Sequence, residues 1–102
     1  MIHVIATITT RPGQRDAALT ALKEIAPTVL KEAGCIEYGA AVDVPSGIPD
    51  QPAPRADSFT VLEKWESLEA LHAHLAAPHM ADYREKVKDI VAGVEIRTLE
   101  SA

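Results

Sequence analysis

Cysteine is almost absent from this chain of 102 residues, which contains Cys35 and no other. A single cysteine cannot form an internal disulfide, and it cannot supply the paired spacing of a zinc-binding motif. We therefore expect Cys35 to be a small packed side chain. We also expect the protein to work in a reducing cytoplasm and to need no metal.

Basic clusters, glycine-rich phosphate loops and long apolar runs are missing as well. The net charge is −5 and no block of Lys and Arg occurs, which argues against nucleic acid as a partner. No Rossmann-type or Walker-type glycine motif is present, so nothing supports a nucleotide cofactor. No stretch is apolar for long enough to span a bilayer, and no signal-peptide pattern opens the chain, so we expect no contact with a membrane.

The first third of the chain has clear hydrophobic periodicity. Residues 2–10 alternate between apolar and polar side chains, as in a half-buried strand. A helix should follow the turn at residues 12–13 and run to about Ala33, with Gly34 at the position that ends it. Pro27 should kink this helix near residues 23–26 or begin a short second helical piece.

The middle of the chain predicts two strands joined by a long loop. Residues 35–43 should form the second strand, with Ile36 and Tyr38 on one face. Residues 44–57 contain four prolines and should be a loop. The loop could be a lid whose Arg55 meets an anionic substrate, or a stiff surface segment that packs on a partner subunit. Residues 59–65 should form the third strand.

Two helices and a last strand complete the chain. Ser67 is a suitable N-cap for the first of these helices. Its buried stripe should consist of Leu68, Leu71 and Leu75. Pro78 should start the second helix, whose apolar face would extend over residues 80–90. Gly93 should then release the last strand.

This order of elements predicts a fold class. Two βαβ units sharing an antiparallel four-stranded sheet make a ferredoxin-like α+β domain over residues 1–102, with the helices on one face of the sheet. The opposite face carries Ile5, Ala41 and Leu62, which is too apolar to face water comfortably. We therefore expect a homodimer in which two sheets pack together.

Four segments carry a family resemblance: VIATITTRPGQ, PTVLKEAGC, EKWES and AHLAAPHMADY. They resemble the antibiotic biosynthesis monooxygenase family, and especially its quinol monooxygenase branch, over nearly the whole chain. The resemblance implies a dimeric α+β barrel that inserts oxygen from O₂ into a quinol or polyphenol without flavin, haem or metal. The substrate would lie between sheet and helices.

Two other functions remain open within the same fold. Some relatives degrade haem with an Asn in the first strand, and Ala6 occupies that position here, which argues against haem. A non-catalytic binding or stress protein is the other alternative, because a fold does not imply a function.

The chemistry implied by the resemblance needs a base, because a quinolate anion passes an electron to oxygen more readily than a neutral quinol does. Histidine is the side chain that titrates near neutral pH. The reaction also needs hydrogen-bond donors for the developing oxyanion and a pocket that excludes water. Three histidines lie near one strand-to-helix junction of this chain: His72, His74 and His79.

The family motif favours His74 and His79 as catalytic residues, whereas helical geometry alone places His72 nearer the buried stripe. For His72 and His74, the structural alternative is a boundary histidine that extends to water. His79 lies at a helix start, where the helix dipole favours the neutral imidazole, and it could also be a plain surface residue. Tyr83, one turn later, could donate to a quinol oxygen or simply belong to an apolar helix face.

Glu63 is the fourth predicted catalytic residue. It lies between Val61 and Trp65 on an apolar strand face, where an unpaired carboxylate is costly. It should pair with a partner such as a histidine, or keep its proton and serve the chemistry. Trp65 itself could be a core filler rather than a ligand contact. The residues predicted to contact the substrate are Trp65, Tyr38, Phe59 and Leu71.

Overall fold

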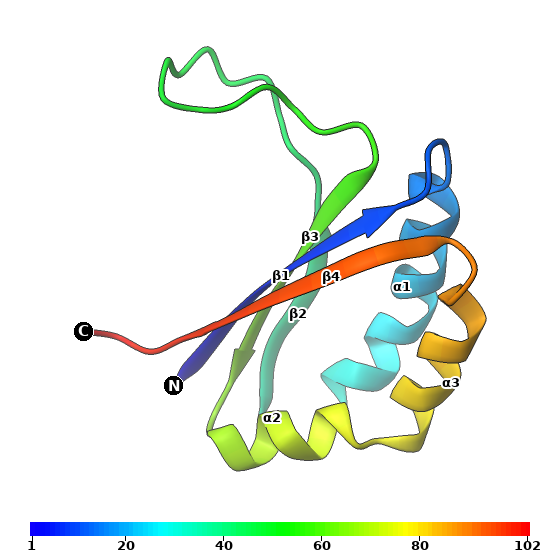
Figure 1. The fold of residues 1–102 in the computed structure, drawn as a ribbon. Coiled ribbons are helices and arrows are strands. Elements are labelled where there is room, and N and C mark those ends of the chain that lie inside the picture. Colours follow the sequence, from blue (N-terminus) through cyan, green and yellow to red (C-terminus); the bar gives the residue numbers. More distant parts are fainter.

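The computed structural model describes residues 1–102, which form one four-stranded sheet and three helices (Figure 1). In chain order the elements are β1 (Ile2–Thr10), α1 (Arg15–Leu30), β2 (Cys35–Ala41), β3 (Ser58–Trp65), α2 (Leu68–Leu75), α3 (Pro78–Val87) and β4 (Val91–Leu99). The strands lie in the order β2-β3-β1-β4, and all neighbouring strands are antiparallel. This is the predicted ferredoxin-like α+β fold.

The core lies between the sheet and the helices, which cover one of its faces (Figure 1). Alternate residues of β1 and β3 point toward the helices, as strand geometry requires. The buried residues of these two strands include Ile2, Val4, Ala6, Ile8, Phe59, Val61 and Trp65. The predicted alternation of β1 and β3 is therefore confirmed.

Helix α1 departs from the prediction at its end. It stays helical through Pro27, so the expected second helical piece does not exist, and it ends at Leu30 rather than near Ala33. Gly34 lies beyond the helix cap and has a φ of +81°, which favours glycine. A Cβ atom built on Gly34 would lie 2.6 Å from the Cβ of Ala70, so the turn after α1 packs directly on α2.

Strand β2 contains an irregularity that the alternating pattern did not reveal. The pairing of β2 with β3 shifts between Cys35 and Glu37, and Ile36 is the extra residue there. Tyr38 is therefore buried while Ile36 is exposed, and the prediction that they share one face is wrong. The strand also ends at Ala41, two residues earlier than predicted.

The proline-rich segment between β2 and β3 is a loop, as predicted, and it projects beyond the sheet (Figure 1). The guanidinium of Arg55 donates to both carboxylate oxygens of Asp43, at 2.8 and 2.9 Å, and this pair closes the base of the loop. The loop leaves the sheet at the end of β2 opposite to Cys35. Arg55 therefore has a structural partner already, and a lid over the Cys35 end of the sheet is not supported.

The junction after β3 is confirmed in part. The hydroxyl of Ser67 accepts a hydrogen bond from the Ala70 amide and caps α2, and Pro78 begins α3. The predicted leucine stripe is wrong at both ends, because Leu68 and Leu75 are exposed and Leu71 alone is buried. The helix is short and turned so that Leu71 and His74, three residues apart, face the core.

The last elements also differ in their bounds. Helix α3 ends at Val87, so Ile90 lies outside it, and β4 already begins at Val91 with Gly93 inside the strand. None of the three helices combines the length and the apolar composition needed to cross a membrane.

Candidate functional site

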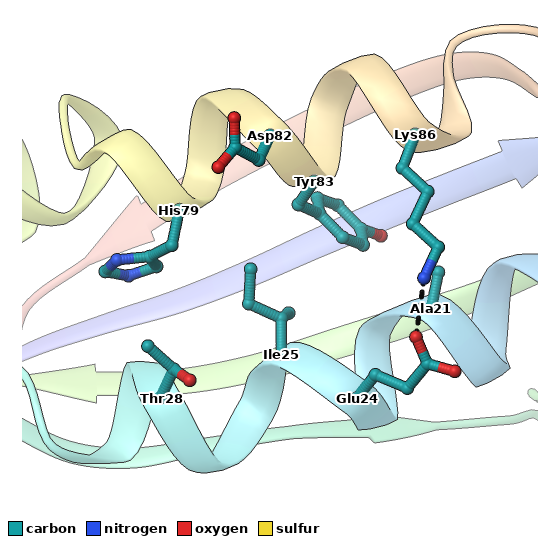
Figure 2. A pocket seen from close by; sticks show the side chains of 8 residues that line it. All are labelled: Ala21, Glu24, Ile25, Thr28, His79, Asp82, Tyr83 and Lys86. Carbon is teal, nitrogen blue, oxygen red and sulfur yellow. Dashed lines mark hydrogen bonds and ion pairs between the residues drawn. The ribbon is translucent and has the colours of Figure 1, made fainter.

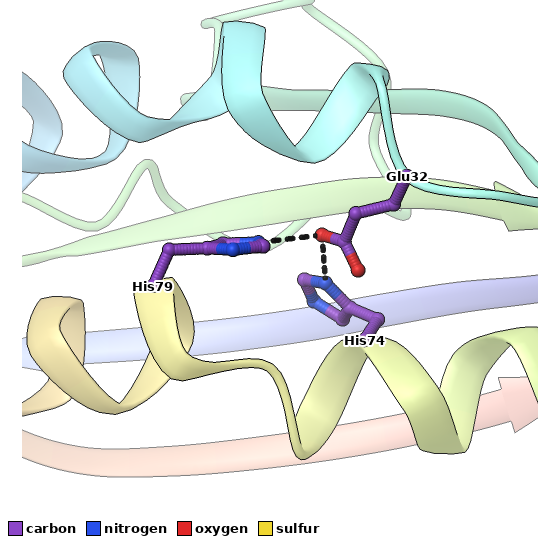
Figure 3. Close-up of side chains that lie close together, drawn as sticks. All are labelled: Glu32, His74 and His79. Carbon is purple, nitrogen blue, oxygen red and sulfur yellow. Dashed lines mark hydrogen bonds and ion pairs between the residues drawn. The ribbon is translucent and has the colours of Figure 1, made fainter.

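Three side chains from three separate segments meet at one end of the helical layer (Figure 3). Glu32 comes from the turn after α1, His74 from α2 and His79 from the first turn of α3. The same carboxylate oxygen, Glu32 Oε2, lies 2.8 Å from His74 Nδ1 and 2.9 Å from His79 Nε2. The group, called here the Glu32 trio, is thus a carboxylate bridging two imidazoles.

The local structure explains why Glu32 reaches the two histidines. Helix α1 ends at Leu30, and the backbone turns at once through Gly34 into β2. The carbonyl of Gly34 accepts a hydrogen bond from the Glu66 amide at 2.8 Å, which ties this turn to the residues that lead into α2. His74 on α2 is therefore held beside the end of α1.

The members of the trio differ in exposure. The side chain of His74 is 2% exposed and that of Glu32 14%, while that of His79 is 29% exposed. His74 is therefore a buried, fixed partner, and His79 is the member that solvent or a ligand reaches most readily.

Glu63 and Trp65 form the floor beneath His74. The indole Nε1–H of Trp65 donates to Glu63 Oε1 at 2.9 Å, and His74 Nε2 lies 4.0 Å from the same oxygen. The rings of Trp65 and His74 pack with their centres 4.6 Å apart. Burial raises the pKa of Glu63, opposed by the hydrogen bond from Trp65 and by nearby His74. The main partner of Glu63 is therefore the indole of Trp65. A histidine, the kind of partner predicted from the sequence, lies farther away, at His74.

Tyr38 packs beside His74, and Cys35 lies near the two carboxylates of the site. The ring of Tyr38 meets His74 edge-on, with 5.5 Å between ring centres. Burial, and then the nearby carboxylates, raise the pKa of the Tyr38 hydroxyl. Burial, Glu32 and Glu63 likewise raise the pKa of the Cys35 thiol. Cys35 thus stays a neutral thiol, a poor nucleophile, which agrees with its interpretation as a packed side chain.

A pocket opens beside the trio, between α1 and α3 (Figure 2). Its volume is about 270 Å³, and its lining residues are Ala21, Glu24, Ile25, Thr28, His79, Asp82, Tyr83 and Lys86. Lys86 and Glu24 pair across its far end (Figure 2). The hydroxyl oxygen of Tyr83 is buried and has no hydrogen-bond partner in the protein. A polar group without a partner at a pocket wall is a group that a ligand can satisfy.

The bridge through Glu32 fixes which imidazole nitrogens carry protons. A carboxylate only accepts hydrogen bonds, so in the neutral form of each imidazole the ring nitrogen that faces Glu32 carries the hydrogen. His74 Nε2 and His79 Nδ1 are then left as free acceptors. A carboxylate-bound histidine with one free nitrogen is the arrangement of a general base.

The eight predicted site residues fall into two groups. His74, His79, Glu63 and Tyr83 lie in or beside this constellation, as do Trp65 and Tyr38. Phe59 and Leu71 are buried core residues that line no part of the pocket. His72, which helical geometry had favoured over His74, is exposed, and that interpretation is wrong because α2 faces the core with Leu71 and His74.

Glu32 is the functional candidate that sequence reasoning missed. It is separated from His74 by 42 positions and from His79 by 47. A glutamate just after the end of a helix is normally expected to be solvated. Nothing in the residues next to Glu32 in the sequence distinguishes it from such a glutamate. The quoted segment PTVLKEAGC does contain it, and that was the only available signal.

Comparisons with known proteins agree with this architecture. The sequence model of the family described as "Antibiotic biosynthesis monooxygenase" matches residues 1–86. The chain is 48% identical over 102 residues to a protein of Escherichia coli (strain K12) named "Probable quinol monooxygenase YgiN", covering 98% of this chain and 97% of that one. A protein of the same name in Shigella flexneri matches equally well.

Solved structures show the same fold. PA3566 from Pseudomonas aeruginosa is 25% identical, with a TM-score of 0.80 over 99% of this chain and 93% of that one. A conserved protein from Methanosarcina mazei Go1 has a TM-score of 0.82 at 22% identity, over 99% of this chain and 92% of that one. At that identity the likeness concerns the fold alone.

Proposed function

This chain belongs to the antibiotic biosynthesis monooxygenase family, and we propose that it is a cofactor-independent monooxygenase of quinols or related polyphenols. The observation that carries the proposal is the Glu32 trio, a carboxylate bridging two histidines at the edge of a pocket. The name of the Escherichia coli relative supports a quinol as the substrate class.

In this proposal the first step is removal of a phenolic proton. His79 is the preferred base, because it lines the pocket and its Nδ1 is free when Nε2–H donates to Glu32. The imidazolium that forms is stabilised by the carboxylate of Glu32, so the proton need not leave the site. His74 donates to the same oxygen through its Nδ1–H and so holds Glu32 in position to stabilise that imidazolium.

The remaining chemistry belongs to the substrate and oxygen. The quinolate passes an electron to O₂, and the two radicals combine at a ring carbon that bears hydrogen. For such a quinol the balance is quinol plus O₂ giving hydroxyquinone plus water. The quinol gives up four electrons, and O₂ accepts four to become one product oxygen and one water. No other reductant is required.

The other predicted residues take supporting roles in the proposal. Tyr83 donates its unpartnered hydroxyl to a substrate oxygen, which stabilises the developing anion. Glu63 and Trp65 fix the position of the His74 ring from below, and Tyr38 fixes it from the side. Contact of Trp65, Tyr38, Phe59 or Leu71 with the substrate stays a prediction.

The test is aerobic incubation of metal-free protein with a reduced naphthoquinone that keeps a ring C–H. Oxygen uptake is followed together with the product mass under isotopically heavy O₂. One heavy oxygen atom per product supports a monooxygenase. Oxygen uptake with an unlabelled quinone product would mean catalysed autoxidation and would contradict the proposal.

Two alternatives predict other outcomes, one in the same test and one in a separate incubation with haem. A non-catalytic binding protein would bind the quinone but leave the rate of oxygen uptake at its uncatalysed value. A haem-degrading enzyme would consume haem in the presence of a reductant. Ala6 weighs against haem, because its methyl group lies buried in the core where those relatives use an asparagine.

A further inference from the structure

The Glu32 trio also has the composition of a transition-metal site. Two imidazoles and one carboxylate, with a water in the fourth position, are a donor set that zinc uses in proteins. One donor atom from each of the three residues lies within 4.8 Å of the others. We propose that the trio binds one Zn²⁺ ion reversibly, and that the bound ion inhibits the proposed oxygenation.

The three side chains must shift to hold the ion. Zinc takes histidine nitrogen at about 2.0–2.1 Å and carboxylate oxygen at about 2.0–2.2 Å. Tetrahedral ligand atoms are therefore somewhat farther apart than the 2.8 and 2.9 Å that join Glu32 Oε2 to the two rings. The three donor atoms are spread over up to 4.8 Å, so the two imidazole nitrogens must also approach each other. Withdrawal of the Glu32 carboxylate and rotation of the partly exposed His79 ring would bring the donor atoms to tetrahedral spacing.

Ion binding and the proposed base function exclude each other at the same nitrogens. The ion would take His74 Nδ1 and His79 Nε2, which donate to Glu32 in its absence. In the neutral imidazole the proton then sits on the other nitrogen. His74 Nε2 and His79 Nδ1, the free acceptors of the metal-free protein, become donors. The proton count is unchanged, and both bases are lost.

A carboxylate already stands where a zinc-bound histidine needs one. Histidine ligands usually donate their second N–H to a carboxylate or carbonyl, which orients the ring. Glu63 Oε1 lies 4.0 Å from His74 Nε2, close enough for a small movement to complete such a bond. Two carboxylates, Glu32 and Glu63, would then balance the two charges of the ion.

The pocket provides a route for the ion. His79 is the member of the trio that lines it, and two carboxylates line it as well: Asp82 on α3, beside His79, and Glu24 on α1, across the pocket (Figure 2). Their negative charge attracts a cation, although Lys86 pairs with Glu24 and offsets part of it. The pocket also leaves room for the water that completes the coordination.

The binding test titrates Zn²⁺ into metal-free protein in competition with a chromophoric chelator. We expect one ion per chain. His79→Ala should weaken binding on the order of 100-fold or more, and Glu63→Gln by about 10–100-fold. His72→Ala is the matched control and should bind as the parent does. Absence of stoichiometric binding, or equal affinity in His79→Ala and His72→Ala, would overturn the site.

A second measurement reports the ligands directly. Co²⁺ in place of Zn²⁺ should give the visible absorption of tetrahedral cobalt in the parent and in His72→Ala. That absorption should disappear in His79→Ala, while circular dichroism shows that the variant keeps its fold. An unchanged cobalt spectrum in folded His79→Ala would place the ion elsewhere.

The inhibitory consequence rests on the proposed function, whereas zinc binding does not. One equivalent of Zn²⁺ should stop quinol-dependent oxygen uptake, and a chelator should restore it. Zinc-loaded protein that turns over at the metal-free rate would overturn the inhibition. Metal-free protein without any oxygen uptake would instead overturn the proposed function and with it the inhibition, and the titration would still decide the site.

Discussion

Apolar side chains are normally buried and charged ones exposed, and the two faces of the sheet depart from this in opposite ways. On the face toward the helices, Glu63 is a carboxylate that is only 8% exposed. On the other face, Ile5 and Leu62 are 40% and 41% exposed, and they lie opposite each other in the pairing of β1 with β3. One face thus buries charge and the other exposes hydrocarbon.

The difference teaches that each exception has its own cause. Glu63 is partly compensated inside the chain, by the indole of Trp65 and by nearby His74, so its contacts need no partner molecule. Ile5 and Leu62 have no such compensation within one chain. The buried Glu63 therefore indicates a chemical role, whereas the exposed Ile5 and Leu62 indicate an interface. The homodimer that we infer from the outer face is a prediction.

Leu62→Lys tests the outer face and should have the largest effect. Two copies of the charge would enter the interface of a symmetric dimer without partners, and an unpaired buried charge costs about 3–5 kcal/mol. Light scattering of the parent should give about twice the chain mass of 11.0 kDa, and Leu62→Lys should dissociate at concentrations where the parent does not.

Leu68→Lys is the matched control, because Leu68 is also exposed, at 51%, but lies on α2 rather than on the sheet. It should leave the assembly unchanged. A parent that scatters as a monodisperse monomer would contradict the dimer, and equal assembly of Leu62→Lys and the parent would show that the interface lies elsewhere.

His79→Ala tests the inner face. Loss of a general base should lower kcat on the order of 10²-fold. The loss should shrink at high pH, where hydroxide ionises the quinol without help. Oxygen uptake at several pH values measures both effects.

His74→Ala should act similarly, and His72→Ala, an exposed position on the same helix, should change little. If His72→Ala were damaging and His74→Ala silent, the assignment of the site would be wrong. Activity that survives in all three variants would favour a function without this chemistry.

The fold could be predicted because it follows from patterns of short range. The alternation of β1 and β3 and the cap at Ser67 are local signals, and they fix the order of elements. What failed depends on contacts between distant segments. The shift after Cys35 that exposes Ile36 is set by pairing with β3, and the turn after α1 lies where Gly34 packs on Ala70 of α2.

The candidate site shows the same division. Glu63 stood out because a carboxylate between Val61 and Trp65 is conspicuous in an alternating strand. The choice between His72 and His74 depended on the family motif, because the leucine pattern suggested the wrong helix face. Glu32 could not be identified from spacing, since the tertiary fold alone brings it to the two histidines.

Tyr83→Phe tests the site on the helical side of the sheet and should have a smaller effect than the histidine variants. The hydroxyl has no partner in the protein, so its removal should leave the thermal midpoint nearly unchanged. If it donates to the substrate anion, kcat/KM should fall about tenfold, the scale of a hydrogen bond to a charged group. A large loss of stability with normal kinetics would show that Tyr83 serves the core instead.

Glu63→Gln has the smallest expected effect and tests the buried charge itself. Burial raises the pKa of Glu63 above its ordinary value of 4.5. Between that value and the higher folded pKa, the folded protein binds more protons than the unfolded chain. The free energy of unfolding should therefore fall as pH rises through this window, and the cost should remain at higher pH. The glutamine carbonyl can still accept from Trp65, so Glu63→Gln should keep the contact and lose this slope.

Denaturant unfolding at a series of pH values measures the difference between the parent and Glu63→Gln, in which the other titrating groups cancel. Glu37→Gln, an exposed change on neighbouring β2, is the control and should retain the parent slope. Should the parent gain stability relative to Glu63→Gln as pH rises toward 4.5 from below, attraction to the surrounding groups would outweigh desolvation at Glu63. The buried carboxylate of Glu63 would then increase the free energy of unfolding instead of lowering it.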